Sequence, residues 1–196
     1  MFHFPAKTEP REPGVGRSLL ERRRIEAEFA KALLDVMAEN VGRERAIELL
    51  SETVTRLAET AGRDFAREAH AGRADLSAYA EILPVWSRGN ALEIDLKRQD
   101  EGRLEFDVTR CRYAEMYRDL GIPELGSVLS CNRDGAFCKG FNPAIKLTRT
   151  RTIMEGADHC DFRYVAEGAA TQPRRTPGAI GRVIRRMLPG ARRARA

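Results

Sequence analysis

The fold is decided by the stretch LEIDLKRQDEGRLEFDVTR at residues 92–110. In LEIDLKR (92–98) and again in LEFDVTR (104–110), apolar residues alternate with charged or polar ones. Such alternation is typical of a strand that buries one face and exposes the other. The sequence between the two runs, QDEG (99–102), favours a turn. We therefore expect an antiparallel hairpin over residues 92–110, with one face in water.

Before the hairpin, the apolar residues have helical spacing. Ser18, with Glu21 three residues later, forms a capping box, so a first helix is expected to begin there. Two further helices are expected, from about Glu44 to His70 and from Asp75 to a point before Pro84. The residues expected to face the core recur at steps of three and four. They are Ile25, Phe29, Leu33 and Met37 in the first helix, and Ile47, Leu50, Val54, Leu57, Ala61 and Phe65 in the second.

After the hairpin, helical patterns give way to strands. Residues 113–120 have a helical pattern, and residues 123–137 are expected to be helical for part of their length, although NRDG (132–135) is also a good turn sequence. Strands are expected over residues 146–154 and 160–165. Helices followed by a hairpin, two helices and two strands predict an α+β fold with an antiparallel sheet.

The charge of the chain is concentrated at one end. The net charge is +5, yet residues 171–196 hold eight arginines and no acidic residue, so residues 1–170 carry a net charge of −3. We expect this basic tail to be disordered, or to contact an anionic partner through an amphipathic segment at residues 180–188. No aromatic stacking pattern or nucleic-acid-binding module accompanies the charge, so no specific nucleic-acid partner is expected.

The rest of the chain is expected to form one domain. Residues 1–17 contain three prolines and two glycines without a hydrophobic period, which predicts a flexible lead-in. The domain is expected to span residues 18–170, with its helical part in residues 18–90 and its sheet and functional site in residues 91–170.

The four cysteines, Cys111, Cys131, Cys138 and Cys160, do not have the spacing of a zinc site. The chain lacks a recognisable export signal and a transmembrane stretch, so we expect a cytoplasmic protein whose cysteines are thiols rather than disulfides. With three histidines and no phosphate-binding loop, HExxH or GxSxG sequence, we expect neither a metal nor a cofactor.

Two arginines are candidates for binding a carboxylate. On a strand over residues 146–154, Arg149 and Arg151 share a face with Leu147 and Ile153. Neighbouring guanidinium groups can bind a carboxylate bidentately. The alternative is that both arginines lie on the solvated face or pair with local acids.

Two short runs contain candidate catalytic groups. His159, Cys160 and Asp161 follow a turn at Gly156, and there Cys160 is a candidate nucleophile and His159 a candidate acid or base. However, neighbouring residues on a strand point to opposite faces, and a cysteine is more often a small buried apolar residue.

The second run contains Cys131 and Asp134, which share a face if the segment is helical, with Cys138 nearby. A thiol beside a carboxylate suits general acid–base catalysis around a nucleophile. The alternative for Asp134 is a cap or turn residue.

Several spaced sequences resemble the L-2-amino-thiazoline-4-carboxylic acid hydrolase family. These are VTRCRYAEMYRDLG (108–121), PELG (123–126) followed by Cys131 and Asp134, and FNPAIKLTRTRTIMEGADHCDFRY (141–164). The resemblance implies hydrolytic opening of a cyclic amidine at a C–N bond, giving N-carbamoyl-L-cysteine in bacterial cysteine formation. The positions that fall on the family's recurring pattern are Cys111, Cys131, Asp134, Gly156, Cys160, Asp161 and Phe162.

This resemblance agrees with the chemistry of the residues. The expected substrate is a small carboxylate, bound by Arg149 and Arg151. Asp134 would hold the proton of the amidine. Cys160 or Cys131 would attack its carbon, with Cys160 preferred because it follows the turn where other polar groups gather, unless a carboxylate activates water directly. The competing function is a non-catalytic small-molecule-binding or sensing domain that uses the same pocket. A homo-oligomer is possible in either case.

Overall fold

The computed structural model describes residues 18–69 and 73–167, so the expected lead-in and basic tail lie outside the described residues. The helices are α1 (Leu19–Val41), α2 (Arg43–Glu68), α3 (Leu76–Ala80), α4 (Leu83–Trp86), α5 (Arg112–Asp119), α6 (Pro123–Gly126) and α7 (Asn132–Phe141), with a π-helical turn η2 (Ser127–Cys131) and a 3-10 turn η3 (Ile153–Glu155). The strands are β1 (Leu92–Gln99), β2 (Arg103–Cys111), β3 (Ile145–Thr148) and β4 (Cys160–Ala166). None of these helices is long and apolar enough to span a membrane.

The four strands form one antiparallel sheet in the order β1-β2-β4-β3. The hairpin expected over residues 92–110 is confirmed as β1 and β2, and β4 pairs with the inner strand β2, where Val108 lies opposite Cys160. The side chains that face the helices are buried; they are Leu104, Phe106 and Val108 of β2, and Cys160, Phe162 and Tyr164 of β4. The α+β fold class is therefore confirmed.

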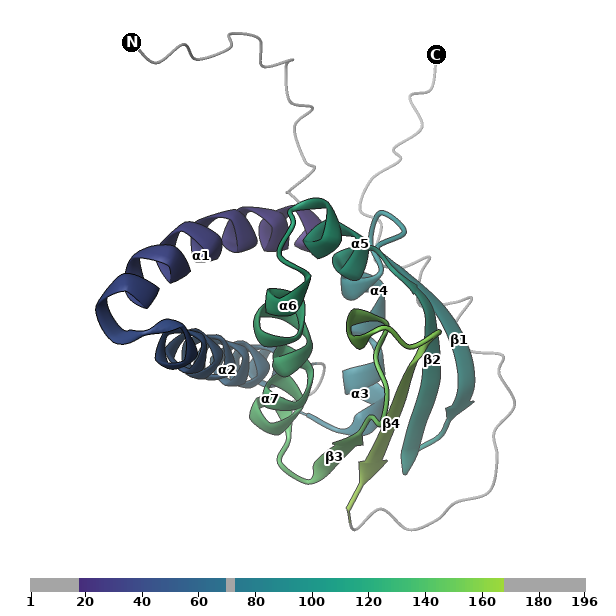
Figure 1. Cartoon of the computed structure of the whole chain (residues 1–196). Coiled ribbons are helices and arrows are strands. Elements are labelled where there is room, and N and C mark those ends of the chain that lie inside the picture. Colours follow the sequence, from purple (N-terminus) through teal and green to yellow (C-terminus); the bar gives the residue numbers. More distant parts are fainter. Residues whose placement is uncertain (1–17, 70–72, 168–196) are drawn as a thin grey trace, which may run out of the picture.

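The helices cover one face of the sheet, and α7 lies between α2 and the strands (Figure 1). Two glycines allow α2 and α7 to approach very closely. A Cβ on Gly62 of α2 would lie 2.2 Å from the carbonyl oxygen of Phe137, and one on Gly140 of α7 would lie 2.1 Å from that of Glu59. The position of α7 over the sheet therefore depends on the absence of side chains at these two sites.

The first helix begins as predicted but buries a different face. Ser18 Oγ accepts a hydrogen bond from the backbone N–H of Glu21 at 3.2 Å, which confirms the capping box. The expected core face is wrong for three of its four residues, since Phe29 is 69% exposed and Ile25 and Leu33 are also exposed, whereas Met37 packs against the core. The buried residues are Ala27, Ala30 and Leu34. The helix has apolar residues on two opposite sides, and the small alanines are the ones that let α1 pack closely against α2.

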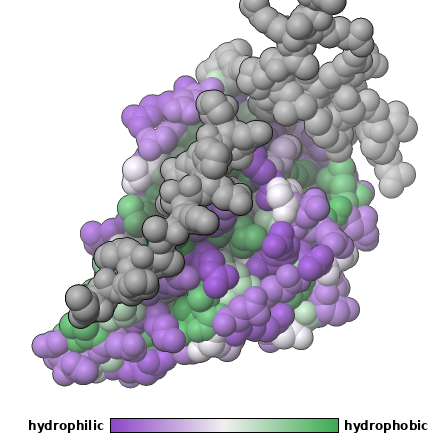
Figure 2. Space-filling model, turned by 90° about the horizontal axis from the view of Figure 1, so that it is seen from above, coloured by the Kyte–Doolittle hydropathy of each residue, from purple (hydrophilic) through white to green (hydrophobic). Residues whose placement is uncertain are grey.

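Most of the other exposed apolar residues of the helical layer lie on α1 and α2, and Val85 of α4 is exposed as well. On the side of the molecule where α1 lies, green hydrophobic residues reach the surface between purple hydrophilic ones (Figure 2). In α2 the expectation was correct for Leu50 and Val54, which are buried, and wrong for Leu57, which is 58% exposed. Ala58 and Gly62 are buried in its place because α2 turns this side toward α7.

In the second half of the chain, the helix expected within residues 123–137 is confirmed, and the strand expected over residues 146–154 is corrected. The helix that contains NRDG continues through residues 132–135 as the first turn of α7, so this sequence does not form a turn between elements. The strand expected over residues 146–154 ends at Thr148. Its continuation is prevented by Asp161, whose carboxylate accepts the backbone N–H groups of Thr150 and Arg151 at 2.9 Å each, in place of a strand partner.

The buried and exposed faces of α1 predict opposite responses to truncation. Leu34→Ala should lower the free energy of unfolding by about 2–4 kcal/mol, because Leu34 is 2% exposed and its loss leaves a cavity. Phe29→Ala should change it by no more than about 0.5 kcal/mol, because the ring is largely in water. Urea unfolding of both variants measures the difference, and a larger loss in Phe29→Ala would contradict the assignment of faces.

Candidate functional site

A cavity of about 310 Å³ lies between the helical layer and the sheet. Its polar or reactive lining residues come from both layers and from the start of α1; they are Arg22, Arg23, Cys111, Tyr113, Ser130, Cys131, Arg133, Asp134, Arg149 and Cys160. Its apolar lining residues include Phe65, Leu83, Trp86, Phe106, Phe137 and Phe162. Four arginines and one aspartate give the wall a net positive charge, which favours an anionic ligand.

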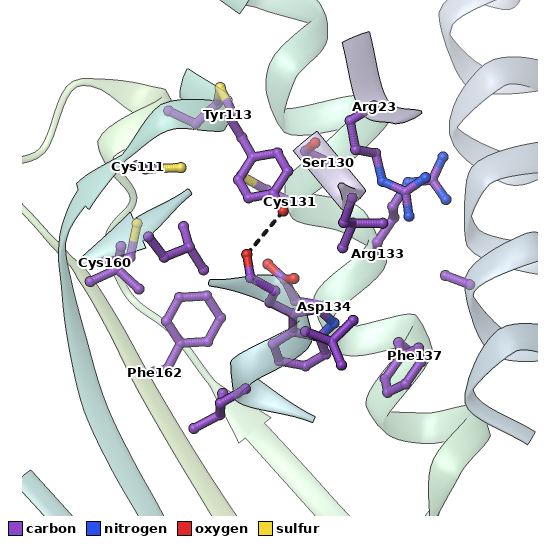
Figure 3. Close-up of a pocket in the computed structure, with 18 of the residues that line it drawn as sticks. Arg23, Cys111, Tyr113, Ser130, Cys131, Arg133, Asp134, Phe137, Cys160 and Phe162 are labelled. Carbon is purple, nitrogen blue, oxygen red and sulfur yellow. Dashed lines mark hydrogen bonds between the residues drawn. The ribbon is translucent and has the colours of Figure 1, made fainter. Parts of the chain in front are cut away.

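The sheet wall contributes two thiols and the aromatic rings of Phe106 and Phe162. Cys160 and Phe162 alternate along β4 and both face the helices, whereas Cys111 is the last residue of β2 (Figure 3). The guanidinium of Arg149 lies over the Phe162 ring, with its Cζ 5.0 Å from the ring centroid. This cation–π contact holds Arg149 against the wall of the cavity, although Arg149 lies beyond the end of β3.

The helical wall contributes Cys131 and Asp134, which line the same cavity as expected from their spacing. Cys131 ends the π-helical turn η2, and Asp134 lies in the first turn of α7 (Figure 3). Asp134 Oδ2 forms an ion pair with Arg149 Nη1, and Arg149 Nη2 donates a hydrogen bond to the carbonyl oxygen of Cys131 at 3.3 Å. The alternative considered for Asp134, a cap or turn residue, is therefore wrong. Asp134 is one half of a charge pair inside the cavity.

The Asp134 carboxyl is well suited to exchange a proton. Burial raises its pKa, and the positive charges of Arg149, Arg23 and Arg133 act in the opposite direction. Within residues 18–69 and 73–167, its second oxygen, Oδ1, receives no hydrogen bond. A carboxylate that is held by one oxygen and open at the other can accept N–H groups or a proton from a ligand.

The environment of each thiol in the cavity disfavours its ionised form. Burial raises the pKa of Cys111 to about 11, and burial followed by the negative charge of Asp134 raises the pKa of Cys131. Burial also raises the pKa of Cys160, although its Sγ accepts the backbone N–H of Ile153 at 3.2 Å. A thiol attacks as the thiolate, so these environments disfavour a cysteine nucleophile.

Three of the residues predicted for the site lie outside the cavity. Arg151 is exposed, because the chain leaves the sheet after Thr148 and the strand face that would align it with Arg149 does not exist. His159 pairs with its exposed neighbour Asp158 at 2.7 Å. Burial raises the pKa of Asp161, but hydrogen bonds from the Thr150 hydroxyl and two backbone N–H groups outweigh it and lower the pKa to about 2.

Cys138, which the sequence placed near Cys131, belongs to the core. Its Sγ donates a hydrogen bond to the carbonyl oxygen of Ile145 at 3.4 Å, and it does not line the cavity. All four cysteines are free thiols, as expected. In the described part of the chain, no group of three or more His, Cys, Asp or Glu residues is placed to hold a metal ion.

Two arginines at the upper end of the cavity were missed by the sequence analysis. Arg23 of α1 and Arg133 of α7 lie close together in Figure 3. Both pair with the carboxylate of Glu26, at 2.6 Å and 2.9 Å. Arg133 Nε also donates to the carbonyl oxygen of Leu129 at 2.7 Å. The two arginines are 110 positions apart, so only the packing of α1 beside η2 and α7 brings them together, and no local pattern could have indicated it.

The sequence matches the family model of L-2-amino-thiazoline-4-carboxylic acid hydrolase over residues 22–164, so the chain belongs to this family. A comparison with curated proteins finds no match. Among solved structures, the trafficking protein particle complex subunit 3 from Naegleria fowleri, covalently bound to palmitic acid, is 8% identical with a TM-score of 0.47, covering 78% of this chain and 99% of that one. The phenol-responsive sensory domain of the transcription activator PoxR with phenol is 14% identical with a TM-score of 0.45, covering 78% of each chain. At these TM-scores, neither likeness carries a functional argument.

Proposed function

We propose that this member of the L-2-amino-thiazoline-4-carboxylic acid hydrolase family opens a cyclic amidine that carries a carboxylate, with L-2-amino-thiazoline-4-carboxylate as the parent substrate. The family supports a hydrolase. The observation that carries the proposal further is the Asp134–Arg149 pair, which places an acceptor for an amidinium beside a donor for a carboxylate in one cavity. A ligand with an amidinium and a carboxylate can pair with both Asp134 and Arg149. A ligand with only one of these groups leaves either Asp134 or Arg149 without a ligand partner.

Asp134 would recognise the amidine. A protonated amidine presents two N–H groups in one plane, and the open Oδ1 of Asp134 is an acceptor for them. The positive wall would hold the substrate carboxylate, with Arg149 as its nearest partner and Arg23 and Arg133 adding to the field. Arg151, which the sequence analysis paired with Arg149, is not part of this proposal because it is exposed outside the cavity.

Atom balance identifies the bond that breaks. Formation of N-carbamoyl-L-cysteine keeps both nitrogens on the amidine carbon and frees the ring sulfur as a thiol. The broken bond is therefore the ring C–S bond, and the sequence-based expectation of C–N cleavage does not fit this product. Water supplies the oxygen of the new carbonyl group.

Our proposed step uses water rather than a thiol as the nucleophile. Asp134 removes one proton from water, and the resulting hydroxide adds to the carbon of the amidinium. The C–S bond then breaks, and the sulfur leaves with its electron pair. Of the two protons that came from water, one is transferred through Asp134 to sulfur and the other is released. A carboxyl whose pKa is raised by burial is a stronger base than an exposed one, which suits this role.

This step predicts that the cysteine favoured by the sequence is dispensable for catalysis. Cys160→Ser should retain kcat within about tenfold of the unchanged protein, because Ser is close in size to Cys and burial raises the pKa of the Cys160 thiol, which disfavours the thiolate. Steady-state kinetics of thiol release tests this. A loss of about 10⁴-fold or more, or trapping of a covalent adduct on Cys160, would instead establish a cysteine nucleophile.

The function itself is tested by incubating the purified full-length protein with the thiazoline acid and a panel of cyclic amidines. Mass spectrometry should find a product heavier by one water, and a thiol reagent should detect one new thiol per product molecule. Absence of turnover for every amidine would overturn the proposal. Formation of this product would support a place in bacterial cysteine formation.

The second candidate is a domain that binds a small molecule without turnover. The specific observation in its favour is that burial raises the pKa of all three cavity thiols, while most of the remaining wall is apolar. The same incubation distinguishes the two functions, because a binding domain would leave the amidine intact. Thermal unfolding should then show a higher melting temperature of the protein when the amidine is present.

A further inference from the structure

The lower half of the cavity is a slot with aromatic walls, and the proposed parent substrate offers nothing to fill it. On the sheet side, Phe106 and Phe162 stack with their ring centroids 4.9 Å apart. On the helical side, Phe137 makes edge contacts with Phe65 at 5.4 Å and with Trp86 at 5.6 Å. All five rings line the cavity, and Figure 3 shows Phe137 and Phe162 on the side of Asp134 away from Arg23.

This slot has the character of a ligand site rather than of an ordinary protein core. Phe65 and Val85 line the slot and are 37% and 42% exposed, so apolar surface is left open to water at its entrance. A volume of about 310 Å³ lies at the lower end of the range of roughly 300–1,000 Å³ that holds drug-sized ligands. The parent thiazoline acid has nine non-hydrogen atoms, five of them nitrogen, oxygen or sulfur, and does not cover aromatic walls.

We propose that the physiological ligand carries an aromatic or branched aliphatic group in addition to its carboxylate, and that this group occupies the slot between Phe106–Phe162 and Phe65–Phe137–Trp86. For the proposed hydrolase, this makes the substrate class cyclic amidine acids with an apolar substituent. The inference rests on the proposed function only in naming an amidine as the reacting group of the substrate. The slot itself is defined by the residues that line the cavity. The polar groups orient one end of the ligand, and the slot selects the other end.

The slot can be tested without the amidine, because Trp86 is the only tryptophan of the chain and lines the cavity. Titration of the full-length protein with 3-phenylpropanoate and with propanoate, followed by tryptophan fluorescence, gives two dissociation constants. The phenyl acid should bind at least about tenfold more tightly, because burial of one aromatic ring corresponds to about 10- to 100-fold in affinity. Equal constants, or no binding of either acid, would overturn the proposal.

A matched pair of variants separates the slot from nonspecific binding. Ala61→Leu adds three carbons to the wall of the slot from α2, whereas Ala32→Leu makes the same change on an exposed face of α1. The dissociation constant of propanoate divided by that of 3-phenylpropanoate should fall to near 1 in Ala61→Leu. In Ala32→Leu this ratio should remain unchanged. Equal ratios in the two variants would contradict the placement of the ring. If Ala61→Leu does not melt as a folded protein, the smaller Ala61→Val serves the same comparison.

The substrate class is tested by comparing kcat/KM for the parent thiazoline acid with that for the acid carrying a phenyl group on the carbon beside sulfur. The substituted acid should be turned over at least about tenfold more efficiently. Preference for the parent acid would overturn the inference while leaving the proposed function intact. Selective binding of the phenyl acid without hydrolysis of any amidine would overturn the proposed function and leave the inferred slot intact.

Discussion

Asp134→Asn is expected to lower kcat/KM for hydrolysis of a cyclic amidine by about 10³-fold. The amide has nearly the shape of the carboxylate, but it cannot take a proton from water and carries no charge to pair with an amidinium. It would also leave Arg149 without its charged partner in the cavity. The loss should appear mainly in kcat if Asp134 acts as the base, and in KM if it only binds the amidine.

The pH profile provides a second readout for the same variant. Because burial raises the pKa of Asp134, the acid limb of kcat/KM should have its midpoint above the ordinary value of 3.8. Activity should be lost as the pH falls through that midpoint, since the protonated carboxyl cannot act as a base. The residual activity of Asp134→Asn should lack this limb. An unchanged acid limb in the variant would assign the titration to another group.

Asp161→Asn is the matched control for Asp134→Asn. Both carboxylates were predicted as site residues, but Asp161 lies on the opposite side of β4 from Cys160 and binds the backbone of Thr150 and Arg151. Its replacement should weaken folding, as urea unfolding would show, and should leave kcat/KM within about tenfold. If both variants lose activity equally with equal losses of stability, the effect at Asp134 is structural, and the proposed role of its carboxylate is wrong.

The features predicted correctly from the sequence are those set by local patterns. The alternation in residues 92–98 and 104–110 predicted the hairpin, and the capping box at Ser18 fixed the start of α1 to within one residue. Cys131 and Asp134 were placed on one face by helical spacing alone. In each case, the interactions that determine the structure connect residues that are near in sequence, so the pattern contains the information.

The features that were missed depend on contacts between distant parts of the chain. The core face of α1 was wrong because Phe29 and Leu34 lie on two competing apolar sides, and only the packing against α2 selects one. The shared strand face of Arg149 and Arg151 was wrong because a side chain of β4, Asp161, ends the neighbouring strand. The pairing of Arg149 with Asp134 likewise becomes visible only when α7 is placed over the sheet.

The placement of α7 over the sheet leads to the largest expected effect on stability. Gly140→Ala should lower the free energy of unfolding by about 3 kcal/mol or more, because the new Cβ would lie 2.1 Å from the carbonyl oxygen of Glu59 and α7 would have to move away from α2. A backbone oxygen cannot rotate aside as a side chain can. Gly62→Ala, whose Cβ would lie 2.2 Å from the carbonyl oxygen of Phe137, should have an effect of similar size.

Gly135→Ala on the same helix is the control, with an expected effect of opposite sign. Gly135 is exposed, and no atom of the described residues outside the neighbouring backbone of α7 lies within 4 Å of a Cβ added there. The substitution should therefore stabilise the protein by roughly 0.5–1 kcal/mol through the higher helix propensity of alanine. Urea unfolding of the three variants measures these differences. Equal and small changes in all of them would show that α2 and α7 do not pack through Gly62 and Gly140.

The same glycines should influence catalysis without touching the substrate. Cys131 and Asp134 are fixed by the position of η2 and α7, so a helix that moves away from α2 also moves Asp134 relative to Arg149. A displacement of about 1 Å can reduce a rate by about 10²-fold. We therefore expect Gly140→Ala, assayed at a temperature where it remains folded, to lose kcat while Gly135→Ala retains it. Normal kcat in a folded Gly140→Ala variant would mean that the site is held by the sheet and not by the contact between the two helices.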